Sequence, residues 1–527
     1  MVFRVLITDP LSSQGIEKLL SAEDVEVIQK TNLTPEELML EIESADALLV
    51  RSQTKVTAEL IEKASRLKVI ARAGVGVDNI DIPAATKKGI IVVNAPDGNT
   101  ISTAEHTFAM LISLSRNIPQ AYQSIVQGRW DRKKYVGIEL NGKTLSIIGL
   151  GRIGSELAKR AKAFQMKVVA YDPYLTQERA EELGVKKATF DEAISTGDYI
   201  TVHTPLTKST HHLINKETFA KMKKGVRILN CARGGIIDEN ALYQAIQDGI
   251  VAGAALDVFE EEPPGNHPLL SLPEVIATPH LGASTVEAQE NVAIDVAEEV
   301  LHILRDQPFK NAVNLPSIPA DLQQKLKPYQ ALAEKLGQFV AQIVDGAIRK
   351  ITVSFAGELA KIDVAPLTRT ILKGALSHHL SDVNYVNAPD LAKQRGVQIL
   401  EQKKSNSHGF TNLIEVSIET SRSKRSASGT LLNGLGPRIV KIDQYSIDLN
   451  PKGHMLLVQH RDQPGVIGQV GTVLGNHDIN IATMQVGRET IGGQAIMMIR
   501  IDKSAPSQVL DQLKEIQVLD AITDIDL

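Results

Sequence analysis

A glycine-rich hexapeptide, GLGRIG at residues 149–154, follows the apolar run Leu145–Ile148 and precedes a helical pattern. With this spacing the first glycine allows a tight turn, the second lets the backbone approach a pyrophosphate, and the third lets helix and strand pack closely. Asp172 ends the next strand-like run, KVVAYD, where a carboxylate accepts hydrogen bonds from an adenosine ribose and repels a 2′-phosphate. These residues predict a site for NAD, although an aspartate at a strand end can also simply cap a turn.

Three further residues have side chains suited to acid–base chemistry on a hydroxy acid. Arg233 lies in NCARGG, Glu262 in DVFEEEPP and His280 in ATPHLGAS, near the ends of late strand-like runs. Hydride transfer from a secondary alcohol needs a base for the hydroxyl proton and a cation for the neighbouring carboxylate. A histidine paired with a carboxylate can exchange that proton, and arginine can hold a carboxylate with two parallel hydrogen bonds. Taken singly, each residue could instead be a core histidine, a solvated acid or a surface cation.

Other reactive side chains have plainer interpretations. Cys231, close to Arg233, is expected to line the cofactor pocket as a small apolar residue, because hydride transfer needs no nucleophile. His211 and His212 have no carboxylate or cysteine partner at ligand spacing, so no metal site is predicted there. His106 falls within a helical pattern and is expected to be a packing residue.

The elements that must position these residues alternate between strand and helix from Val5 to about residue 280. Nearly continuous apolar runs of this kind are typical of parallel strands covered on both faces, which predicts a doubly wound α/β sheet. The predicted strands include Ala47–Val50, Val69–Ala71, Ile91–Val93, Leu145–Ile148, Val168–Tyr171, Tyr199–His203, Val226–Leu229 and Val275–Ala277.

Two long helical patterns interrupt the alternation and are candidates for crossing between two α/β units. One begins near Thr100, and the other runs from Thr285, a plausible N-cap, to about Arg305. The segment NAVNLPSIP at 311–319 reads as a linker. Residues 320–450 show mixed patterns, with polar stretches at 403–407 and 421–428 expected to be loops or solvated faces.

The last part of the chain has a β-α-β-β-α-β rhythm. Strand-like Met455–Val458 leads into a turn, Arg461–Gly465, and a helix pattern that ends near Asn476. Two strand-like runs and a further helix pattern follow at 479–486, 495–501 and 507–516. This order predicts a ferredoxin-like domain.

Composition and charge exclude several functional classes. The chain has 527 residues, enough for three or four domains of ~150 residues each. A formal net charge of -5 argues against a nucleic-acid-binding surface, which is normally basic. No uncharged apolar stretch approaches the ~20 residues that cross a bilayer, and a single cysteine excludes a disulfide framework. We therefore expect a cytoplasmic protein that contacts neither nucleic acid nor membrane and holds no metal.

Over about residues 1–315, these segments resemble the D-2-hydroxyacid dehydrogenase family. The matching motifs in chain order are RAGVGVDNID, NAPDGNT, TAEHTFAM, GLGRIG, HTPLT, NCARGG, ALDVFEEEPP and TPHLGAST. In that family the arginine of ARGG holds the substrate carboxylate, and the glutamate before proline pairs with the PHLG histidine, which acts as acid and base. The resemblance gives these catalytic roles to Arg233, Glu262 and His280.

The resemblance also implies two sets of binding residues. Substrate contacts are implied at Arg51, Arg72, Asn99, Arg233 and His280. Cofactor contacts are implied at Gly149, Gly151, Arg152, Ile153, Gly154, Asp172, Thr204, Cys231, Ala232, Arg233, Asp257, His280, Gly282 and Ala283. The basic cluster Arg132, Lys133 and Lys134 is a candidate for binding a phosphorylated substrate and, equally, for a solvated basic loop.

Within the family, the chain is most similar to long-form members that oxidise 3-phosphoglycerate to 3-phosphohydroxypyruvate with NAD, the first step of L-serine synthesis. Such members carry an intervening domain and a C-terminal ACT domain, whose signature RDQPGVIGQVGTVLGNHDINI matches. ACT domains of these enzymes often bind L-serine between two chains as a feedback inhibitor. That site would fall on His460, Asp462, Gly465 and Asn480, with Asp462 replacing the asparagine of some relatives.

The expected architecture is α/β. It comprises two doubly wound parallel-sheet domains (flavodoxin-like and Rossmann), an α+β intervening domain and a ferredoxin-like ACT domain. The expected boundaries are 1–98 with 288–316 for substrate binding, 99–287 for NAD, 319–450 for the intervening domain and 453–527 for the ACT domain. Family members pair through the nucleotide-binding domain, so a homodimer or homotetramer is expected.

Two other functions stay open. One is oxidation of another D-2-hydroxy acid, such as glycerate, lactate or 2-hydroxyglutarate. The other is a non-catalytic NAD-sensing interaction protein, as in transcriptional corepressors that resemble the family.

Overall fold

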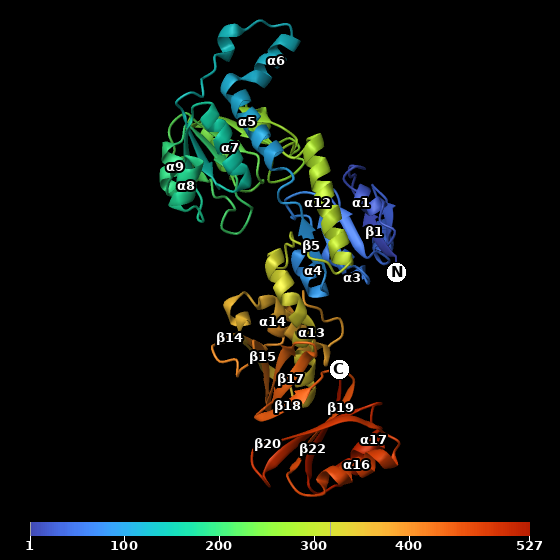
Figure 1. Cartoon of the computed structure of the whole chain (residues 1–527). Helices are drawn as coiled ribbons and strands as arrows, with labels where there is room; N and C mark the ends of the chain where they lie inside the picture. Colours follow the sequence, from blue (N-terminus) through green and yellow to red (C-terminus); the bar gives the residue numbers. More distant parts are fainter. Residues whose placement is uncertain (1, 317) are drawn as a thin grey trace.

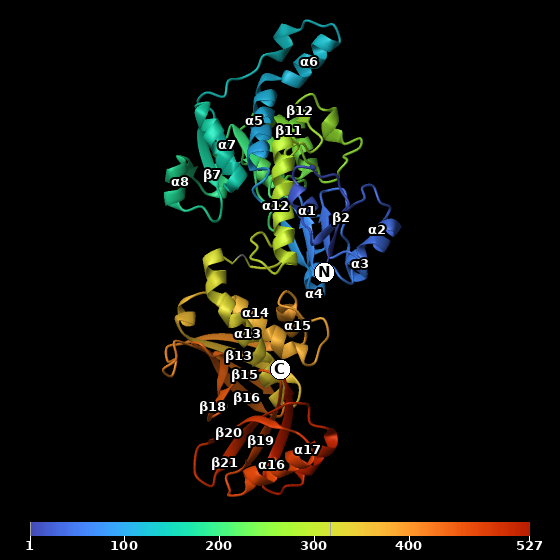
Figure 2. The same cartoon turned by 45° about the vertical axis from the view of Figure 1, so that its right-hand side comes forward.

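The computed structural model describes residues 2–316 and 318–527. Its four sheets form four units that follow one another along an elongated molecule, with the seven-stranded unit at one end and the four-stranded unit at the other (Figure 1). The second view keeps the same order, so the elongation does not depend on the direction of viewing (Figure 2).

The first unit has a parallel five-stranded sheet in the order β2-β1-β3-β4-β5. Its strands are β1 (Phe3–Ile7), β2 (Val25–Gln29), β3 (Ala47–Val50), β4 (Val69–Arg72) and β5 (Ile91–Asn94). Alternate residues of β4 enter two different cores, with Val69 on one face and Ile70 on the other. The covering helices are α1 (Glu17–Leu20), α2 (Pro35–Ile42), α3 (Ala58–Lys63), α4 (Ile82–Lys88) and α12 (Val286–Leu304). This is the flavodoxin-like order that we expected.

The second unit has a seven-stranded parallel sheet in the Rossmann order β12-β11-β10-β9-β6-β7-β8. Its strands are β6 (Thr144–Ile148), β7 (Lys167–Tyr171), β8 (Lys186–Lys187), β9 (Tyr199–Val202), β10 (Val226–Asn230), β11 (Val251–Leu256) and β12 (Val275–Ala277). Its helices are α5 (Thr100–Arg116), α6 (Ile118–Val126), η1 (Arg132–Tyr135), α7 (Arg152–Ala163), α8 (Gln177–Leu183), α9 (Phe190–Thr196), α10 (Lys216–Phe219), α11 (Glu239–Gln247) and η2 (Pro268–Ser271).

The two long helices begin where the chain crosses between these units. The Thr285 hydroxyl accepts a hydrogen bond from the Ala288 amide, which confirms the predicted N-cap of α12. Helix α12 then packs on β3, β4 and β5 of the first sheet, whereas α5 packs on β10, β11 and β12 of the second. Residues on either side of the crossing therefore face one cleft. In these two sheets, strands β2, β8 and β11 were absent from our predictions.

The predicted linker at 311–319 is wrong in its first half. Ala312 forms an antiparallel bridge with Val93, and the Val313 amide donates to the Val92 carbonyl. This half of the segment therefore closes the edge of the first sheet; residue 317 lies outside the described residues. Short extended pieces that pair with a sheet edge leave no period in the sequence, which is why this one escaped prediction.

The third unit is a mixed six-stranded sheet, β14-β13-β15-β16-β17-β18, covered by helices on one face. Its strands are β13 (Ile348–Gly357), β14 (Gln398–Lys404), β15 (Asn412–Thr420), β16 (Lys424–Leu432), β17 (Gly436–Ile442) and β18 (Tyr445–Leu449). Its helices are α13 (Ala320–Ile343), η3 (Glu358–Lys361), α14 (Ala365–Ser377) and α15 (Ala388–Gln394). The prediction of a loop or solvated face at 421–428 is wrong at its end, because β16 begins at Lys424 and buries Ala427 and Ser428. When small and polar residues face the core, polarity along the sequence does not predict which residues are buried.

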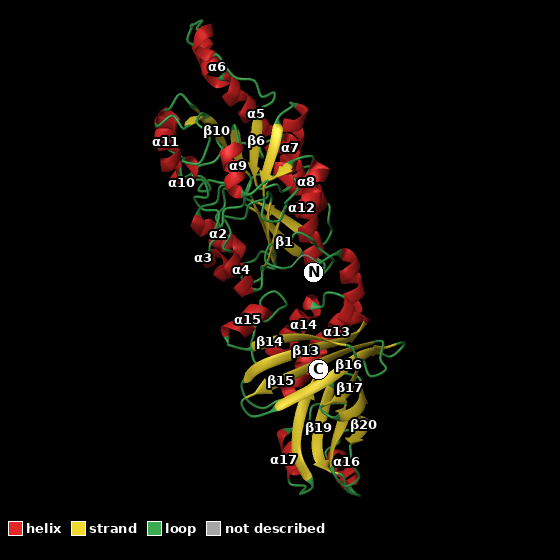
Figure 3. Cartoon of the chain, turned by 90° about the vertical axis from the view of Figure 1, so that its left-hand side faces the viewer, coloured by secondary structure: helices red, strands yellow, loops and turns green. Residues whose placement is uncertain are grey.

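The fourth unit is the predicted ferredoxin-like domain, with antiparallel strand order β20-β21-β19-β22. Its elements are β19 (His454–Arg461), α16 (Val466–Asn476), β20 (Ile481–Arg488), β21 (Gln494–Ile501), α17 (Ser507–Lys514) and β22 (Leu519–Asp526). Both helices lie on the face of the sheet away from the third unit (Figure 3). Among the described residues, no helix combines the length and apolar character needed to cross a membrane.

Candidate active site

The glycine turn has the geometry that its three glycines predict. Gly149 has φ +98°, and a side chain there would lie 2.7 Å from the carbonyl oxygen of His203. A side chain at Gly154 would overlap the Gly149 carbonyl, because α7 packs directly on β6. Gly151 faces open space, since a Cβ atom at this position would have no neighbouring atom within 4 Å among the described residues. The turn is therefore tight on the inside and open on the outside, as a pyrophosphate requires.

The groups around this open space suit a dinucleotide anion. Helix α7 begins at Gly151 without a side-chain cap and without an acidic residue in its first turn, so its amides and positive end are available. The buried Thr204 hydroxyl has no hydrogen-bond partner among the described residues. The Asp172 carboxylate accepts from the amides of Leu150 (2.9 Å) and Tyr174 (2.8 Å). These bonds hold Asp172 beside the turn, which confirms that it caps a turn, and they leave lone pairs free; the ribose contact stays a prediction.

The predicted acid–base pair is already formed. The Nδ1 atom of His280 lies 2.8 Å from Oε2 of Glu262, and the Phe259 amide donates to the other carboxylate oxygen at 3.2 Å. Partial burial opposes ionisation of Glu262, but the hydrogen bonds from His280 and Phe259 outweigh it and lower the pKa of this carboxyl. Because Nδ1 faces Glu262, the Nε2 atom of His280 remains free to face a substrate hydroxyl. A cavity of about 340 Å³ lies beside the pair.

A buried carboxylate fixes the loop that carries His280. Asp257, only 1% exposed, accepts hydrogen bonds from the Thr278 hydroxyl (2.6 Å) and from the amides of Leu281 (2.7 Å) and Gly282 (2.8 Å). His280 itself has φ +57°, a left-handed backbone conformation that needs such support in a residue other than glycine. Both oxygens of Asp257 are therefore engaged within the chain. This gives Asp257 a positioning task beside the cofactor contact that the resemblance implied.

His106 has a polar partner in this network. Its Nε2 atom lies 3.2 Å from Oδ1 of Asp257 and 3.1 Å from the Thr278 hydroxyl. The expectation that His106 only packs within α5 is thus wrong. Desolvation would raise the pKa of Asp257, but the hydrogen bonds from His106 and Thr278 lower it overall. A polar contact between a helix and a distant strand end has no local sequence signal.

The predicted arginines gather at the substrate side of the cleft. Arg72 ends β4, and its pKa is lowered to about 10 by desolvation and by the nearby charges of Arg233 and Arg51. The Nε atom of Arg72 is buried without a hydrogen-bond partner among the described residues. Arg233 donates from Nε to Asp78 at 3.1 Å. Three cations and two carboxylates, Asp78 and the buried Asp9, therefore act at this place, and the net positive charge suits an anionic substrate.

A glycine loop makes room for this cluster. Side chains at Gly74 or Gly76 would overlap the guanidinium groups of Arg72 and Arg233, respectively. Asp78 belongs to the same loop, and our sequence reasoning missed its ion pair. The motif RAGVGVD could have indicated this arrangement. Two glycines beside charged residues suggest that the charged side chains pack closely against the backbone of the loop.

The remaining predicted contacts lie around the mouth of the cleft. The Asn99 side-chain oxygen is buried without a partner among the described residues, just before α5. Arg152 at the start of α7 pairs with Asp97 of the first unit at 2.5 Å, which links the two sides. Burial raises the pKa of Cys231 to about 12, so its thiol stays neutral. Ile153 is half-buried in the first turn of α7, and Ala232, Gly282 and Ala283 are buried or half-buried in the turns that follow strands.

Two clusters lie outside the cleft. Arg132, Lys133 and Lys134 are exposed on η1, in the projecting segment after α6. His212 has carboxylate partners after all, with Nε2 lying 3.0 Å from Oε1 of Glu260 and Nδ1 3.8 Å from Asp238. The described residues nevertheless contain no cluster of three or more His, Cys, Asp or Glu arranged to hold a metal ion.

The four predicted effector residues of the last unit lie around the β19–α16 turn and the start of β20. His460 is 2% exposed, and its Nε2 atom has no partner among the described residues. Asp462 pairs with Arg488 at 2.7 Å, and this hydrogen bond lowers the pKa of the carboxyl. Asn480 donates to Asp502 at 2.8 Å. Gly465 has φ +91° and begins α16.

Three segments match known families. Residues 108–282 match the D-isomer specific 2-hydroxyacid dehydrogenase, NAD binding domain; residues 325–443 match the D-3-phosphoglycerate dehydrogenase intervening domain; and residues 454–517 match the ACT domain. The chain thus contains an NAD-binding domain and an ACT domain. The solved D-lactate dehydrogenase of Aquifex aeolicus, complexed with NAD and lactic acid, is 32% identical with a TM-score of 0.53 and covers 60% of this chain and 100% of its own.

Full-length relatives narrow the assignment. The D-3-phosphoglycerate dehydrogenase of Bacillus subtilis is 50% identical over 527 residues, which is 100% of both chains. That of Methanocaldococcus jannaschii is 48% identical over 526 residues, covering 99% of this chain and 100% of the relative. Because the likeness extends through all four units, the chain belongs to the D-3-phosphoglycerate dehydrogenase family.

Proposed function

We propose that the protein oxidises 3-phosphoglycerate to 3-phosphohydroxypyruvate with NAD, the first step of L-serine synthesis. One observation carries the proposal. The cleft contains both a hydrogen-bonded His280–Glu262 pair and a cluster of three arginines, Arg51, Arg72 and Arg233. A lone carboxylate would need one such cation. Extra cations at the same place suit a substrate that also carries a phosphate.

Each residue has one task in this reaction. Arg233 binds the substrate carboxylate, and Arg51 and Arg72 bind the phosphate together with Asn99. NAD bound at the glycine turn supplies the acceptor for the hydride from C2. His280 removes the C2 hydroxyl proton through Nε2. Glu262 holds the ring in this tautomer and stabilises the imidazolium that forms.

The network behind His280 keeps these groups aligned. Asp257 holds the 278–282 loop, so that His280 keeps its left-handed backbone while the proton moves. His106 supports Asp257 from α5. We therefore assign Asp257 and His106 as positioning residues. Their loss should lower the rate of turnover more than it weakens substrate binding, because a misplaced base still leaves the arginines intact.

The decisive experiment compares two substrates. NADH formation is followed with 3-phosphoglycerate and with D-glycerate, which lacks the phosphate. We expect kcat/KM to be at least about 100-fold higher for 3-phosphoglycerate, because D-glycerate cannot form the charged hydrogen bonds of the phosphate to Arg51 and Arg72. Equal values would favour another D-2-hydroxy acid as the substrate. Absence of turnover with either, alongside NADH binding, would favour the NAD-sensing alternative.

A second copy of the chain is the partner that we propose. Helix α6 projects from the body with few neighbours (Figure 1). It and the segment after it expose large apolar side chains: Ile118 (48%), Tyr122 (68%), Ile125 (53%), Val126 (61%), Trp130 (77%) and Val136 (78%). An apolar arm of this size favours burial against another chain. We infer a homodimer or homotetramer that pairs through this arm, and deletion of 118–136 should yield monomers in light scattering.

We also propose L-serine as an effector of the ACT domain. The buried and unpartnered Nε2 atom of His460 supports this proposal, because a polar ligand would satisfy it. Asp462 pairs with Arg488 and Asn480 donates to Asp502, and a bound ligand would exchange these partners. Serine at millimolar concentration should change either activity or melting temperature. No change in either would contradict the proposal.

We propose four domains. They are the substrate-binding domain at 1–98 with 288–316, the NAD-binding domain at 99–287, the intervening domain at 319–450 and the ACT domain at 453–527. The contacts of α5 with the second sheet and of α12 with the first support the two crossing points.

A further inference from the structure

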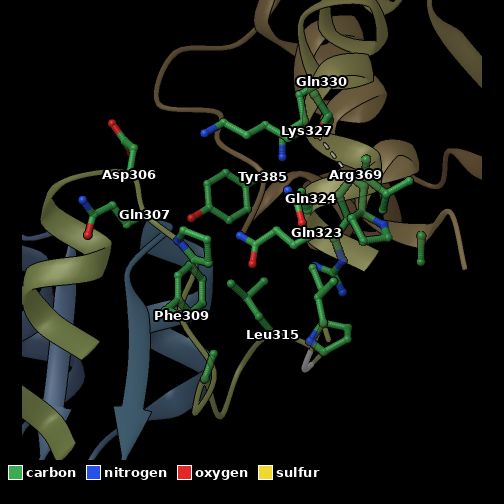
Figure 4. A pocket seen from close by; sticks show the side chains of 18 of the residues that line it. Asp306, Gln307, Phe309, Leu315, Gln323, Gln324, Lys327, Gln330, Arg369 and Tyr385 are labelled. Atoms are coloured by element: carbon green, nitrogen blue, oxygen red, sulfur yellow. Dashed lines mark hydrogen bonds between the residues drawn. The ribbon is translucent and has the colours of Figure 1, made fainter. Parts of the chain in front are cut away.

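A cavity of about 600 Å³ lies at the junction of the first and third units, and its described lining contains none of the predicted catalytic residues. Its walls come from the segment after α12, from α13 and from α14 (Figure 4). A volume in this range fits a small organic molecule, and junctions between structural units are frequent ligand sites.

One wall carries two cations, Arg369 and Lys327, that have no salt-bridge partner among the described residues. Arg369 of α14 is half-buried and forms neither an ion pair nor a side-chain hydrogen bond among the described residues. Desolvation lowers its pKa, and only the more distant Asp390 acts in the other direction. Lys327 of α13 lies on the same side (Figure 4) and is also without a salt bridge among those residues. A guanidinium carries five donors, so leaving it half-desolvated without an acceptor is costly.

The opposite wall is apolar with polar groups at its edge. Phe309 and Leu315 come from the segment after α12, and Tyr385 lies between them and α13 (Figure 4). Desolvation, with a contribution from Asp306, raises the pKa of Tyr385 to about 12, so its hydroxyl remains a neutral donor. Gln323 adds an amide. The cavity thus offers cations on one side and aromatic or aliphatic carbon on the other.

The acids that line the cavity do not cancel these cations. Glu334 is paired with Lys373 at 2.8 Å. Asp363 accepts a hydrogen bond from the Ala365 amide. Asp306 lies on the far side from Arg369 (Figure 4). Counting Lys310 and Lys373, the cavity lining carries four cations and three carboxylates, so a net positive charge remains for an anion to meet.

We propose that this cavity binds a small organic anion, whose phosphate or carboxylate group is held by Arg369 and Lys327 and whose apolar body lies against Phe309 and Leu315. Such a ligand touches two structural units at once. They already contact each other through a loop in which the Asn384 side chain donates to the Gly89 carbonyl (2.9 Å) and the Asn387 side chain to the Lys87 carbonyl (3.3 Å). The ligand would extend this contact to the other side of the junction.

The test is isothermal titration calorimetry on the full chain saturated with NADH. The probes are phenyl phosphate, benzoate and inorganic phosphate, which separate the contribution of the head group from that of the apolar body. We expect phenyl phosphate or benzoate to bind at least about tenfold more tightly than inorganic phosphate, because only they fill the apolar side. The tighter of the two identifies the preferred head group.

Three variants locate the binding. Arg369→Gln should weaken binding by about tenfold or more, and Lys327→Gln, at an exposed position that folding does not require, by a few fold. Arg422→Gln is the matched control, because Arg422 is an exposed arginine of the same unit that pairs with Asp345. Unchanged affinity in both cavity variants, equal binding of all three probes, or no binding to the wild-type chain would overturn the proposal. Activity with 3-phosphoglycerate shows that each variant is folded.

Discussion

The catalytic cleft and the ACT domain each bring together a histidine, acidic residues and an arginine, but these side chains are arranged differently. In the cleft, the side chains of His280 and Glu262 are 47% and 38% exposed, and they pair with each other in front of open space. In the ACT domain, His460 is 2% exposed, and Asp462 and Asn480 are already bonded to Arg488 and Asp502.

This difference is the one expected between a catalytic site, here the cleft, and an effector-binding site, here proposed in the ACT domain. Catalytic groups must be aligned before the substrate arrives, because alignment during the reaction would add to the barrier. A regulatory site gains from internal pairs that a ligand replaces, since exchange of partners is what changes the conformation. The following predictions test this contrast, from the largest expected effect to the smallest.

Replacing His280 with alanine should have the largest effect. Loss of the base should lower kcat by about 10³-fold, while NADH still binds, because the glycine turn is untouched. Turnover is measured by NADH absorbance and binding by fluorescence titration. The exposed His379 is a matched control, and His379→Ala should leave both unchanged. A decrease in kcat of less than tenfold would show that His280 is not the acid–base residue.

Arg51→Gln should distinguish substrates. We expect kcat/KM for 3-phosphoglycerate to fall by roughly 10- to 100-fold, because one charged hydrogen bond to the phosphate is lost. The value for D-glycerate should change little. Arg66→Gln, which removes a cation paired with Asp46 in the same unit, provides the control. Equal losses with both substrates would mean that Arg51 does not contact the phosphate.

Glu262→Gln should reveal the pairing through its pH dependence. The folded pKa of Glu262 is lowered, so its ionised form contributes stability above the unfolded value of about 4.3 and loses it as pH falls through the lower folded value. The melting temperature of the variant should therefore lie below wild type at neutral pH and approach it in acid. A constant difference across this range would argue that the carboxylate is not paired in solution.

Asp462→Ala should have the smallest effect on basal turnover. The ACT domain lies at the far end of the molecule from the cleft, so kcat without serine should stay within about twofold of wild type. The response to serine should be lost. An unaltered serine response would exclude Asp462 from the effector site and leave His460 and Asn480 to be tested. Glu489→Ala, an exposed neighbour, is the control.

Much of the cleft was predictable from short motifs. The glycines at 149, 151 and 154 and the trio of Arg233, Glu262 and His280 follow buried strands, and parallel strands bring their carboxyl ends to one edge. The contacts that escaped prediction join distant segments, as with His106 and Asp257 or Arg152 and Asp97. Such pairs depend on how helices and loops pack, and neither residue type nor local spacing records that.

The sequence by itself determined the cofactor turn, most strands of the two parallel sheets and the side chains that are candidates for acid–base chemistry, because each is set by local backbone geometry and chemistry. Only the tertiary structure decided which cations share a space, which carboxylates are engaged within the chain, and where an unneutralised arginine faces a cavity. Those properties depend on desolvation and on distances between residues remote in sequence. Neither quantity can be read from a pattern of residue types.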